Sequence, residues 1–300
     1  EMCIRDRGYD PDYSAALSSA ASLLGPMIPP SITLIVYAGL TEASVQKLFL
    51  ATLTPAILCT VAFLAYTLWY GKKKNLPKQP KKTAKEAGKI MLDAIWALLL
   101  PVIVLGLIFS GATTVTEAAA VSCLYSAVVS LFIYKTITFK DLLKILGDSA
   151  VSIAAIMILV GMSKATAYVV ISSQMPQLFM DFITSITDSR FVVLLIINVI
   201  FLILGCLMEG NCIIVMMVPL LLTLVKSFGI DLLQFGVMSA INIYIGCITP
   251  PVGVSLLLGC KLGKTSVGGT FKAILPFFAI SMVILILVTY WPSFTLWLIH

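Results

Sequence analysis

The chain contains the stretch Gly25-Pro-Met-Ile-Pro-Pro-Ser31, and a second stretch, Gly246-Cys-Ile-Thr-Pro-Pro-Val252, closely resembles it. Both stretches lie inside long apolar segments, where a Pro-Pro pair removes two backbone donors and interrupts a regular helix. The likeness continues downstream, because Ser44-Val45 and Ser266-Val267 follow the two stretches at nearly the same distance. Two related breaks predict an internal repeat of the kind found in membrane transporters, whose halves usually oppose each other across the bilayer.

The composition excludes a water-soluble fold. Of the 300 residues 60% are hydrophobic and 11% are charged, and the mean hydropathy is +1.06. Soluble domains, in contrast, contain about 25% charged residues. A membrane-spanning helix needs about 20 apolar residues, so the chain has room for roughly eight of them. We therefore expect an all-α polytopic membrane protein surrounded by the lipid bilayer.

Much of the positive charge lies in one segment. The formal net charge is +6, and eight of the 20 basic residues fall within residues 71–89, GKKKNLPKQPKKTAKEAGK. A lysine-rich segment between two apolar spans is typical of a cytoplasmic loop next to anionic lipid. Neither a known fold nor interleaved aromatic residues support nucleic-acid binding, so we expect no nucleic acid as a partner.

The side-chain chemistry argues against an enzyme. The single histidine is His300, and the seven cysteines form no CxxC pair. Acid–base catalysis or metal ligation by histidine therefore has no suitable residue, and no nucleophile–base pair is evident. We expect no catalytic residue and no cofactor, with sodium only as a coupling ion.

Apolar segments predict the helices. Clean spans are expected over residues 48–70, 91–109, 118–134 and 274–291, and further apolar pieces cover residues 15–40, 149–171, 191–208, 212–224 and 235–258. Residues 15–40 should form two half-helices around the first break, and residues 246–253 should interrupt the last piece. Ser172-Ser-Gln-Met-Pro176 and the apolar residues up to about 186 fit a re-entrant hairpin and a span with an interfacial helix equally well.

The two breaks are the candidate sodium sites. A Pro-Pro pair leaves upstream carbonyl groups without helical donors, which is costly in lipid unless another group satisfies them. Sodium is a hard cation that takes oxygen ligands, and carbonyl and hydroxyl oxygens at a break are such ligands. The alternative is that the prolines only shape the helices. The candidate sodium-binding residues are Gly25, Pro29, Ser31, Gly246, Thr249, Pro250 and Gly253.

Polar residues inside apolar segments are candidates for substrate contact or for a helix break. Glu209 and Asn211 separate two apolar pieces, Lys164 lies within residues 149–171, and Ser173 lies in the polar stretch that follows. An intramembrane charge often marks a functional site. Snorkelling to the membrane interface is an equally good interpretation for Lys164. For Glu209 we favour a position near the sodium or substrate site, where half-helix amino termini would bind a carboxylate.

The other intramembrane carboxylate, Glu117, is expected at a helix end. Thr114-Val-Thr-Glu117 has the capping-box pattern, in which the threonine and glutamate side chains each bond a backbone N–H of the other residue. The pattern stands directly before the apolar residues 118–134. We therefore expect Thr114 and Glu117 to cap that helix.

Short motifs occur in a fixed order along the chain. The motifs are Gly8-Tyr-Asp10, Gly25-Pro-Met-Ile-Pro-Pro-Ser31, Thr114-Val-Thr-Glu-Ala-Ala-Ala120, Gly205-Cys-Leu-Met-Glu-Gly210, Gly229-Ile-Asp231, Phe235-Gly236, Thr249-Pro-Pro-Val-Gly253 and Pro276-Phe277. In this order they are similar to the large membrane subunit of TRAP transporters, a permease of the DctM type. The resemblance covers about residues 8–300, with residues 1–7 outside it, and Val115 and Gln234 depart from residues common in the family.

The resemblance implies a fold and a function. The fold would consist of two structural repeats with broken helices and re-entrant hairpins in an elevator-type architecture. The function would be sodium-coupled import of an organic acid, such as a C4-dicarboxylate or sialic acid, across the bacterial inner membrane. A periplasmic substrate-binding protein and a small TRAP membrane subunit would be the partners. The competing hypothesis is an ion or anion channel with a broken-helix filter.

The expected organisation is that of a carboxy-terminal fragment. Residues 1–7 would be an extension outside the family, residues 8–70 the end of a first repeat, residues 71–89 the cytoplasmic loop and residues 90–300 a second repeat. If the two repeats are similar in size, on the order of 140 residues of the first repeat would precede Gly8.

Overall fold

A computed structural model describes residues 9–74 and 83–299, and these residues form helices joined by short connections. The expected extension at residues 1–7 and the middle of the lysine-rich segment, residues 75–82, lie outside the described residues. The side chains of several residues within 84–89 and 152–171 also lie outside them, and Lys164 is one of these.

The described helices confirm an all-α polytopic membrane protein. Seven of them are long and apolar enough to cross a bilayer, by length and composition. The seven candidate spans are Pro11–Thr41, Val45–Lys73, Ile90–Phe109, Val115–Ile133, Arg190–Leu207, Gly210–Ser227 and Val267–Tyr290. The contacts divide the chain into two compact units, of which unit 1 comprises Glu1–Pro77 and Met162–His300 and unit 2 comprises Lys78–Gly161.

Unit 2 is a helical hairpin followed by the start of a long helix. It contains α6 (Ala84–Phe109), α7 (Val115–Val128), the π-helix η1 (Val129–Ile133) and the first part of α8 (Phe139–Ser172). Two tyrosines hold the hairpin together, since Tyr125 donates to the carbonyl of Trp96 at 2.8 Å and Tyr134 to that of Asp93 at 2.7 Å. The apolar side chains of the hairpin are largely exposed, as in helices that face lipid.

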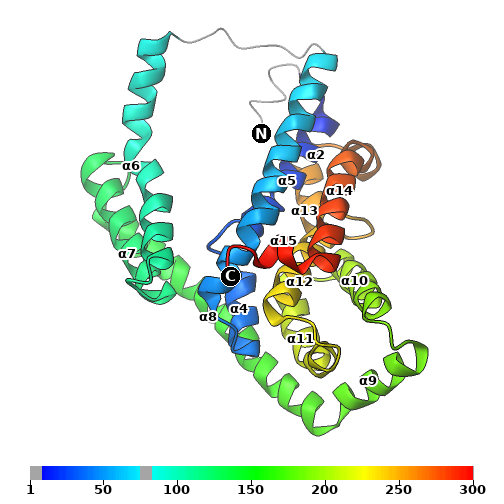
Figure 1. Ribbon diagram of the computed structural model, residues 1–300. Coiled ribbons are helices and arrows are strands. Elements are labelled where there is room, and N and C mark those ends of the chain that lie inside the picture. The colour runs from blue at the N-terminus through cyan, green and yellow to red at the C-terminus, as the bar shows by residue number, and fades with distance from the viewer. Residues whose placement is uncertain (1–8, 75–82, 300) are drawn as a thin grey trace. The chain divides into compact units, whose positions relative to one another are not determined.

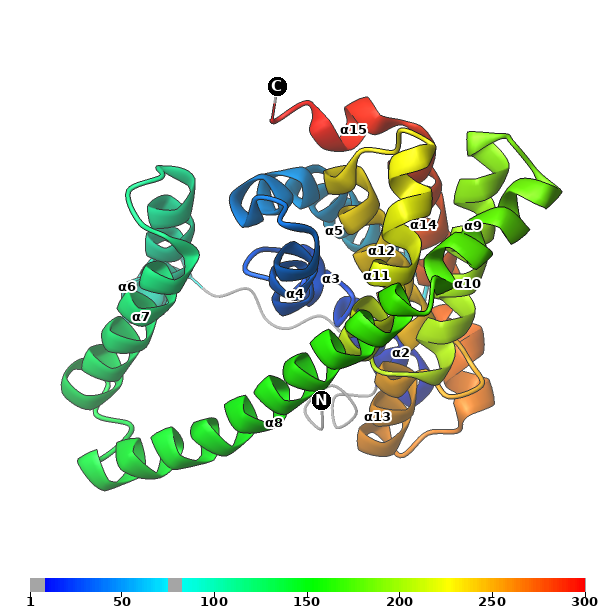
Figure 2. The same ribbon diagram turned by 90° about the horizontal axis from the view of Figure 1, so that it is seen from below.

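Unit 1 contains the two proline breaks and is built around α12. Most residues of α12 (Leu232–Cys247) are buried, and α10, α11, α14, α4 and α5 pack against it (Figures 1 and 2). The other helices of this unit are α2 (Pro11–Ala21), α3 (Leu24–Met27), α4 (Ile32–Thr41), α5 (Val45–Lys73), the end of α8, α9 (Met175–Ile186), α10 (Arg190–Leu207), α11 (Gly210–Ser227), α13 (Val254–Gly263), α14 (Val267–Tyr290) and α15 (Pro292–Leu296).

Buried amides tie α12 to its neighbours. Asn242 of α12 donates to the backbone and side-chain oxygens of Asn198 on α10, at 2.8 and 2.7 Å. Gln234 of α12 donates to the carbonyls of Val288 and Thr289 on α14, at 3.0 and 2.8 Å. Lipid offers helices no hydrophobic drive to associate, so such interhelical hydrogen bonds and close packing hold them together.

Small residues allow α2 and α13 to approach closely. Ala15 and Ser19 of α2 face Gly259 and Gly263 of α13, and each pair is spaced by four residues. A Cβ atom added to Gly259 would overlap the hydroxyl of Ser19. This hydroxyl donates to the carbonyl of Ser255 at 3.1 Å. The contact has the small-xxx-small form common between membrane helices.

The observed helices agree with most of the predicted segments and differ at their ends. Residues 15–40 form α2, α3 and α4, and a one-turn helix therefore occupies the first break. The lysine-rich loop is shorter than residues 71–89, because α5 continues to Lys73 and a capping box at Thr83 starts α6. Only Ser173 and Gln174 separate α8 from α9. Both interpretations of residues 149–186 require two helices in this region, and α8 and α9 are these two helices.

We predict that Gly259→Ala destabilises the protein, because the added methyl group overpacks the α2–α13 contact. The expected loss is roughly 1–3 kcal/mol, which lowers the midpoint of thermal unfolding by several degrees. Differential scanning fluorimetry in mild detergent measures it. Gly268→Ala at the start of α14 is the control, since a Cβ there meets no atom within 4 Å. An equal midpoint for both variants would contradict the packing argument.

Candidate ion and substrate site

Three of the helix interruptions within the described part of unit 1 form the candidate site. The first separates α3 from α4 at residues 28–31, the second separates α10 from α11 at residues 208–209, and the third separates α12 from α13 at residues 248–253. The first and third contain the Pro-Pro pairs, and in both pairs a cis peptide bond joins the prolines. Each interruption is followed at once by the amino terminus of a helix, whose free N–H groups carry partial positive charge.

The second and third interruptions touch through backbone. A Cβ atom on Gly205 would lie 2.7 Å from the carbonyl oxygen of Ile243, and one on Gly246 would lie 2.5 Å from the Cα of Gly205. The N–H of Gly253, at the third break, donates to the carbonyl of Cys206, in the last turn of α10, at 3.0 Å. Because glycine alone fits at both contact points, the end of α10 is held directly against the α12–α13 break.

The first interruption joins the other two through hydroxyl groups. Thr33, in the first turn of α4, donates to the side-chain oxygen of Asn211 at 3.0 Å. The same hydroxyl forms a hydrogen bond with the hydroxyl of Tyr244 on α12. Thr33 is 1% exposed, so its hydroxyl is screened from the surroundings. One buried group therefore links the starts of α4 and α11 to the end of α12.

Glu209 caps α11. One carboxylate oxygen accepts hydrogen bonds from the backbone N–H groups of Asn211 and Cys212, at 3.0 and 3.2 Å. The other accepts from the side-chain amide of Asn211 at 2.9 Å. A carboxylate at a helix amino terminus is stabilised by the helix dipole. The cap also turns the side-chain oxygen of Asn211 toward Thr33. The position of Glu209 near a sodium or substrate site remains a prediction.

The first break offers neutral oxygen atoms. Ser31 is 2% exposed, and its hydroxyl oxygen has no hydrogen-bond partner. Proline has no N–H, so Pro29 and Pro30 leave the carbonyls of Gly25 and Pro26 without their helical donors. A buried hydroxyl without a partner is costly, and an ion or ordered water commonly accounts for such a group.

The third break brings two carbonyl oxygens together. Gly253 has a φ of +49°, a conformation that favours glycine. A Cβ atom at this position would lie 2.7 Å from the carbonyl oxygen of Thr249 and 3.2 Å from that of Cys247. The bare Cα therefore leaves open a small space that these oxygens border. Thr249 adds a hydroxyl, which donates to the carbonyl of Ile245 at 2.8 Å and retains its own acceptor capacity.

The structure groups most of the predicted site residues. The third break contains or adjoins four of them, Gly246, Thr249, Pro250 and Gly253, and it lies against the end of α10 at Gly205 and Cys206. Two more, Glu209 and Asn211, lie at the start of α11. The first break contains Pro29 and Ser31, just before Thr33. Gly25 lies in α3, and a Cβ there meets no atom within 4 Å.

The remaining predicted residues lie elsewhere. Ser173 follows α8, where its N–H donates to the carbonyl of Val169. Thr114 and Glu117 form a capping box at the start of α7 in unit 2. The side chain of Lys164 lies outside the described residues.

Sequence reasoning did not single out Thr33 and Tyr244, and it quoted Gly205 within a motif without a role. Thr33 stands two residues after Ser31, and Tyr244 stands two residues before Gly246. A hydroxyl-bearing residue within four residues of a helix break, inside an apolar segment, is the signal that could identify both. The contact of Gly205 with Gly246 joins helices about 40 residues apart, and no local pattern marks it.

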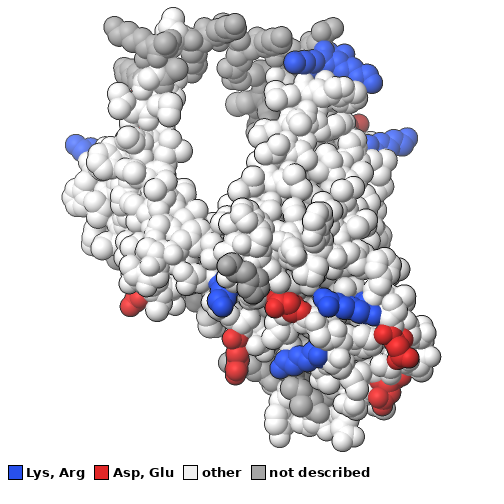
Figure 3. All heavy atoms as spheres, in the orientation of Figure 1, with Lys and Arg blue, Asp and Glu red and all other residues white. Residues whose placement is uncertain are grey.

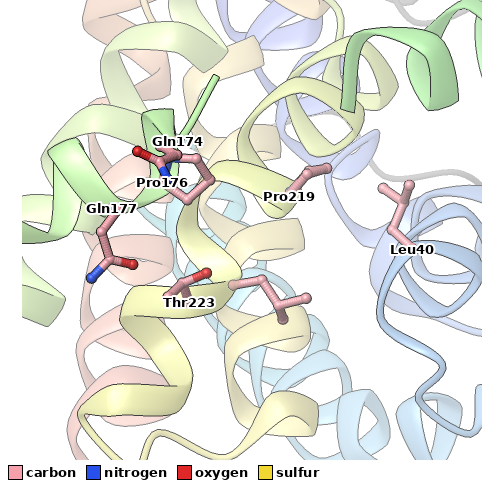
Figure 4. A pocket seen from close by; sticks show the side chains of 7 residues that line it. Leu40, Gln174, Pro176, Gln177, Pro219 and Thr223 are labelled. Atoms are coloured by element: carbon pink, nitrogen blue, oxygen red, sulfur yellow. The ribbon is translucent and has the colours of Figure 1, made fainter. Parts of the chain in front are cut away.

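A separate cavity lies away from the breaks. It has a volume of about 540 Å³ and lies among the end of α4, the start of α9 and the middle of α11 (Figure 4). The residues that line it are Leu40, Gln174, Pro176, Gln177, Pro219, Leu222 and Thr223. None of the break residues borders this cavity, so it is distinct from the candidate site.

Interrupted helices that meet inside an all-helical membrane protein are typical of secondary transporters. The chain belongs to the DctM family, because its residues 2–294 match the family described as the DctM component of the tripartite ATP-independent periplasmic transporter. The match includes residues 2–7, which the motifs of the resemblance do not cover.

Three relatives illustrate the family. The chain is 34% identical to a sialic acid TRAP transporter large permease protein of Vibrio cholerae, over 98% of this chain and 69% of the relative. It is 37% identical to a C4-dicarboxylate TRAP transporter large permease protein of Pseudomonas aeruginosa, over 96% and 68%. It is 32% identical to a sialic acid TRAP transporter permease protein of Haemophilus influenzae, over 97% and 47%. All three are transporter permeases and not enzymes.

We predict that Thr33 and Tyr244 are energetically coupled. Thr33→Val and Tyr244→Phe each remove one hydroxyl of the shared hydrogen bond, so the double variant should lose less stability than the sum of the single losses, by about 1 kcal/mol. Thermal unfolding of the four proteins measures this coupling. Thr33→Val with Ser281→Ala is the control pair, because Ser281 bonds its own helix at the carbonyl of Phe277. Strict additivity in the first pair would contradict the link between α4 and α12.

Proposed function

We propose that the chain is the permease subunit of a sodium-coupled, binding-protein-dependent importer of organic acids. The observation that carries this proposal is the meeting of three helix interruptions within one unit. In lipid such irregular backbone is tolerated only where it is packed in protein or lines a polar cavity. Carriers place coupling-ion and substrate sites at such interruptions. Membership in the DctM family supports the same function.

The donor set suits sodium. The first break offers an unpartnered buried hydroxyl at Ser31, and the third offers the carbonyls of Thr249 and Cys247 around the Cα of Gly253. These are neutral oxygens, the ligands that a hard cation accepts. Both oxygens of Glu209 already accept hydrogen bonds from α11. Carbonyls and hydroxyls at the two breaks are therefore the proposed sodium ligands.

The substrate would be a carboxylate. The relatives named above transport sialic acid or C4-dicarboxylates, which are organic anions. The starts of α4 and α13 present helix amino termini next to the breaks, and such termini bind anions without a basic side chain. An organic acid would therefore approach the same breaks that bind sodium, so that one conformational change moves both.

The architecture and the partners follow from the same proposal. The two Pro-Pro breaks, with similar flanking sequence and similar backbone, support two repeats and an elevator-type carrier in the bacterial inner membrane. A periplasmic binding protein would deliver the substrate, and a small membrane subunit would complete the complex. The broken-helix channel is less favoured, because the relatives are permeases of periplasmic transporters.

Uptake by the complete complex tests the proposal. Proteoliposomes that contain this permease and its small subunit are supplied with binding protein and labelled organic acids, with and without an inward sodium gradient. We expect uptake that needs both the gradient and the binding protein. Uptake of the same size without a sodium gradient would refute sodium coupling, and uptake without the binding protein would favour the channel.

We predict that Pro250→Ala with Pro251→Ala weakens sodium dependence. In a regular helix the new N–H at position 251 would bond the carbonyl of Cys247 and withdraw this proposed ligand from a cation. Loss of a ligand should raise the sodium concentration for half-maximal uptake about tenfold, which corresponds to roughly 1.4 kcal/mol. Pro276→Ala is the control, because this proline lies inside α14 and away from the breaks. Unchanged sodium activation in the double variant would exclude a site at this break.

A further inference from the structure

One end of unit 1 consists of the start of α2, the end of α5 and the α13–α14 connection. The rings of Tyr13 and Tyr70 stack with their centroids 3.8 Å apart, which places the start of α2 beside the last turn of α5. Thr270, in the first turn of α14, donates to the carboxylate of Asp12 at 3.5 Å. These three segments therefore face the same side of the bilayer.

This end is strongly basic. Six exposed lysines stand against the two aspartates Asp10 and Asp12, and the lysines are Lys72, Lys73, Lys74, Lys261, Lys264 and Lys272. Figure 3 shows basic side chains gathered over the end of α5, at the top of the view. By the positive-inside rule, this end faces the cytoplasm.

The opposite end has nearly balanced charge. Tyr37 of α4 donates to the carbonyl of Leu232, and Tyr290 of α14 donates to that of Phe191, so the ends of α4 and α14 lie beside the starts of α12 and α10. The exposed charges near this end are Lys47, Arg190 and Lys226 against Glu42, Asp181, Asp188 and Asp231. The two ends of unit 1 therefore differ in the sign of their electrostatic potential.

The end of α5 combines charge with aromatic rings. Lys72 and Lys73 are the last residues of α5, Lys74 follows, and all three side chains are exposed. The ammonium group of Lys73 lies 4.8 Å from the ring centroid of Trp69, whose side chain is 54% exposed. Tryptophan next to lysine is typical of the headgroup level of a membrane, where the ring lies among the lipids and the ammonium group reaches outward.

The described residues provide no carboxylate that neutralises the three ammonium groups at the end of α5. Among the described residues, no carboxylate forms an ion pair with Lys72, Lys73 or Lys74. The apolar part of α5 begins directly below them and is exposed on its outer face, for example at Leu64 and Leu68. An anion bound here would therefore touch charge on one side and lipid-facing hydrocarbon on the other.

We propose that Lys72, Lys73 and Lys74, together with Trp69, bind the headgroups of anionic phospholipid in the cytoplasmic leaflet. The lysines attract the phosphate groups, and the exposed indole packs among the upper parts of the acyl chains. Each lysine near an anionic surface contributes roughly fivefold in affinity, so three adjacent lysines favour anionic over zwitterionic lipid clearly. The proposal does not depend on sodium coupling or on the identity of the substrate.

Native mass spectrometry tests the proposal. The full chain in mild detergent is equilibrated with equal amounts of phosphatidylglycerol and phosphatidylcholine, and the lipid retained on the protein is counted. We expect phosphatidylglycerol to exceed phosphatidylcholine about fivefold or more. In the variant that combines Lys72→Gln, Lys73→Gln and Lys74→Gln, the ratio should fall several-fold, although Lys261, Lys264 and Lys272 remain at this end. Replacement of the same lysines by arginine should preserve the preference, because it keeps the charge.

A triple variant at the opposite end is the matched control. This variant combines Lys47→Gln, Arg190→Gln and Lys226→Gln. It loses the same formal charge as the α5 variant and should keep the preference for phosphatidylglycerol. Equal retention of both lipids by the unmodified chain, or an unchanged preference in the α5 glutamine variant, would overturn the proposal. An equal loss in both triple variants would also overturn it, because it would show an effect of net charge alone.

Discussion

The dominant constraint on this protein is that backbone polar groups inside a bilayer need partners within the protein. Regular helices satisfy it by themselves, and most of the described chain is helical. The three interruptions of unit 1 do not, and they are therefore packed against one another. The N–H of Gly253 at the third break donates to the carbonyl of Cys206 at the end of α10, and Glu209 accepts from two of the N–H groups that open α11. The irregular segments thus supply partners for each other.

This constraint explains the central position of α12. A break can be covered only if a neighbouring helix approaches closely, and close approach requires residues without bulky side chains. Gly205 and Gly246 provide that contact between α10 and α12, and Asn198 and Asn242 extend it toward the other end of the same helices. Gln234 then joins α12 to α14. A core of this kind is held by steric fit and hydrogen bonds, since burial from lipid adds little.

Local chemistry predicted much of the fold, and contacts across the chain account for what was missed. The Pro-Pro pairs predicted breaks because proline interrupts a helix wherever it stands inside one. Thr114 and Glu117 were placed at a helix start because a capping box lies within four residues. The link from Thr33 to Tyr244 spans more than 200 residues, so no local pattern contains it. The short α15 has too few residues to show a period.

The arrangement of charges at the breaks bears on how sodium and substrate would be coupled in the proposed carrier. The proposed ligands are neutral, and the carboxylate of Glu209 already accepts hydrogen bonds from α11. A sodium ion bound to these neutral oxygens would add a positive charge in surroundings of low dielectric, where a charge is unfavourable unless an anion lies near. A substrate carboxylate at the adjacent helix amino termini would offset it. Each ligand would then bind better in the presence of the other, and this reciprocal effect is what coupling requires.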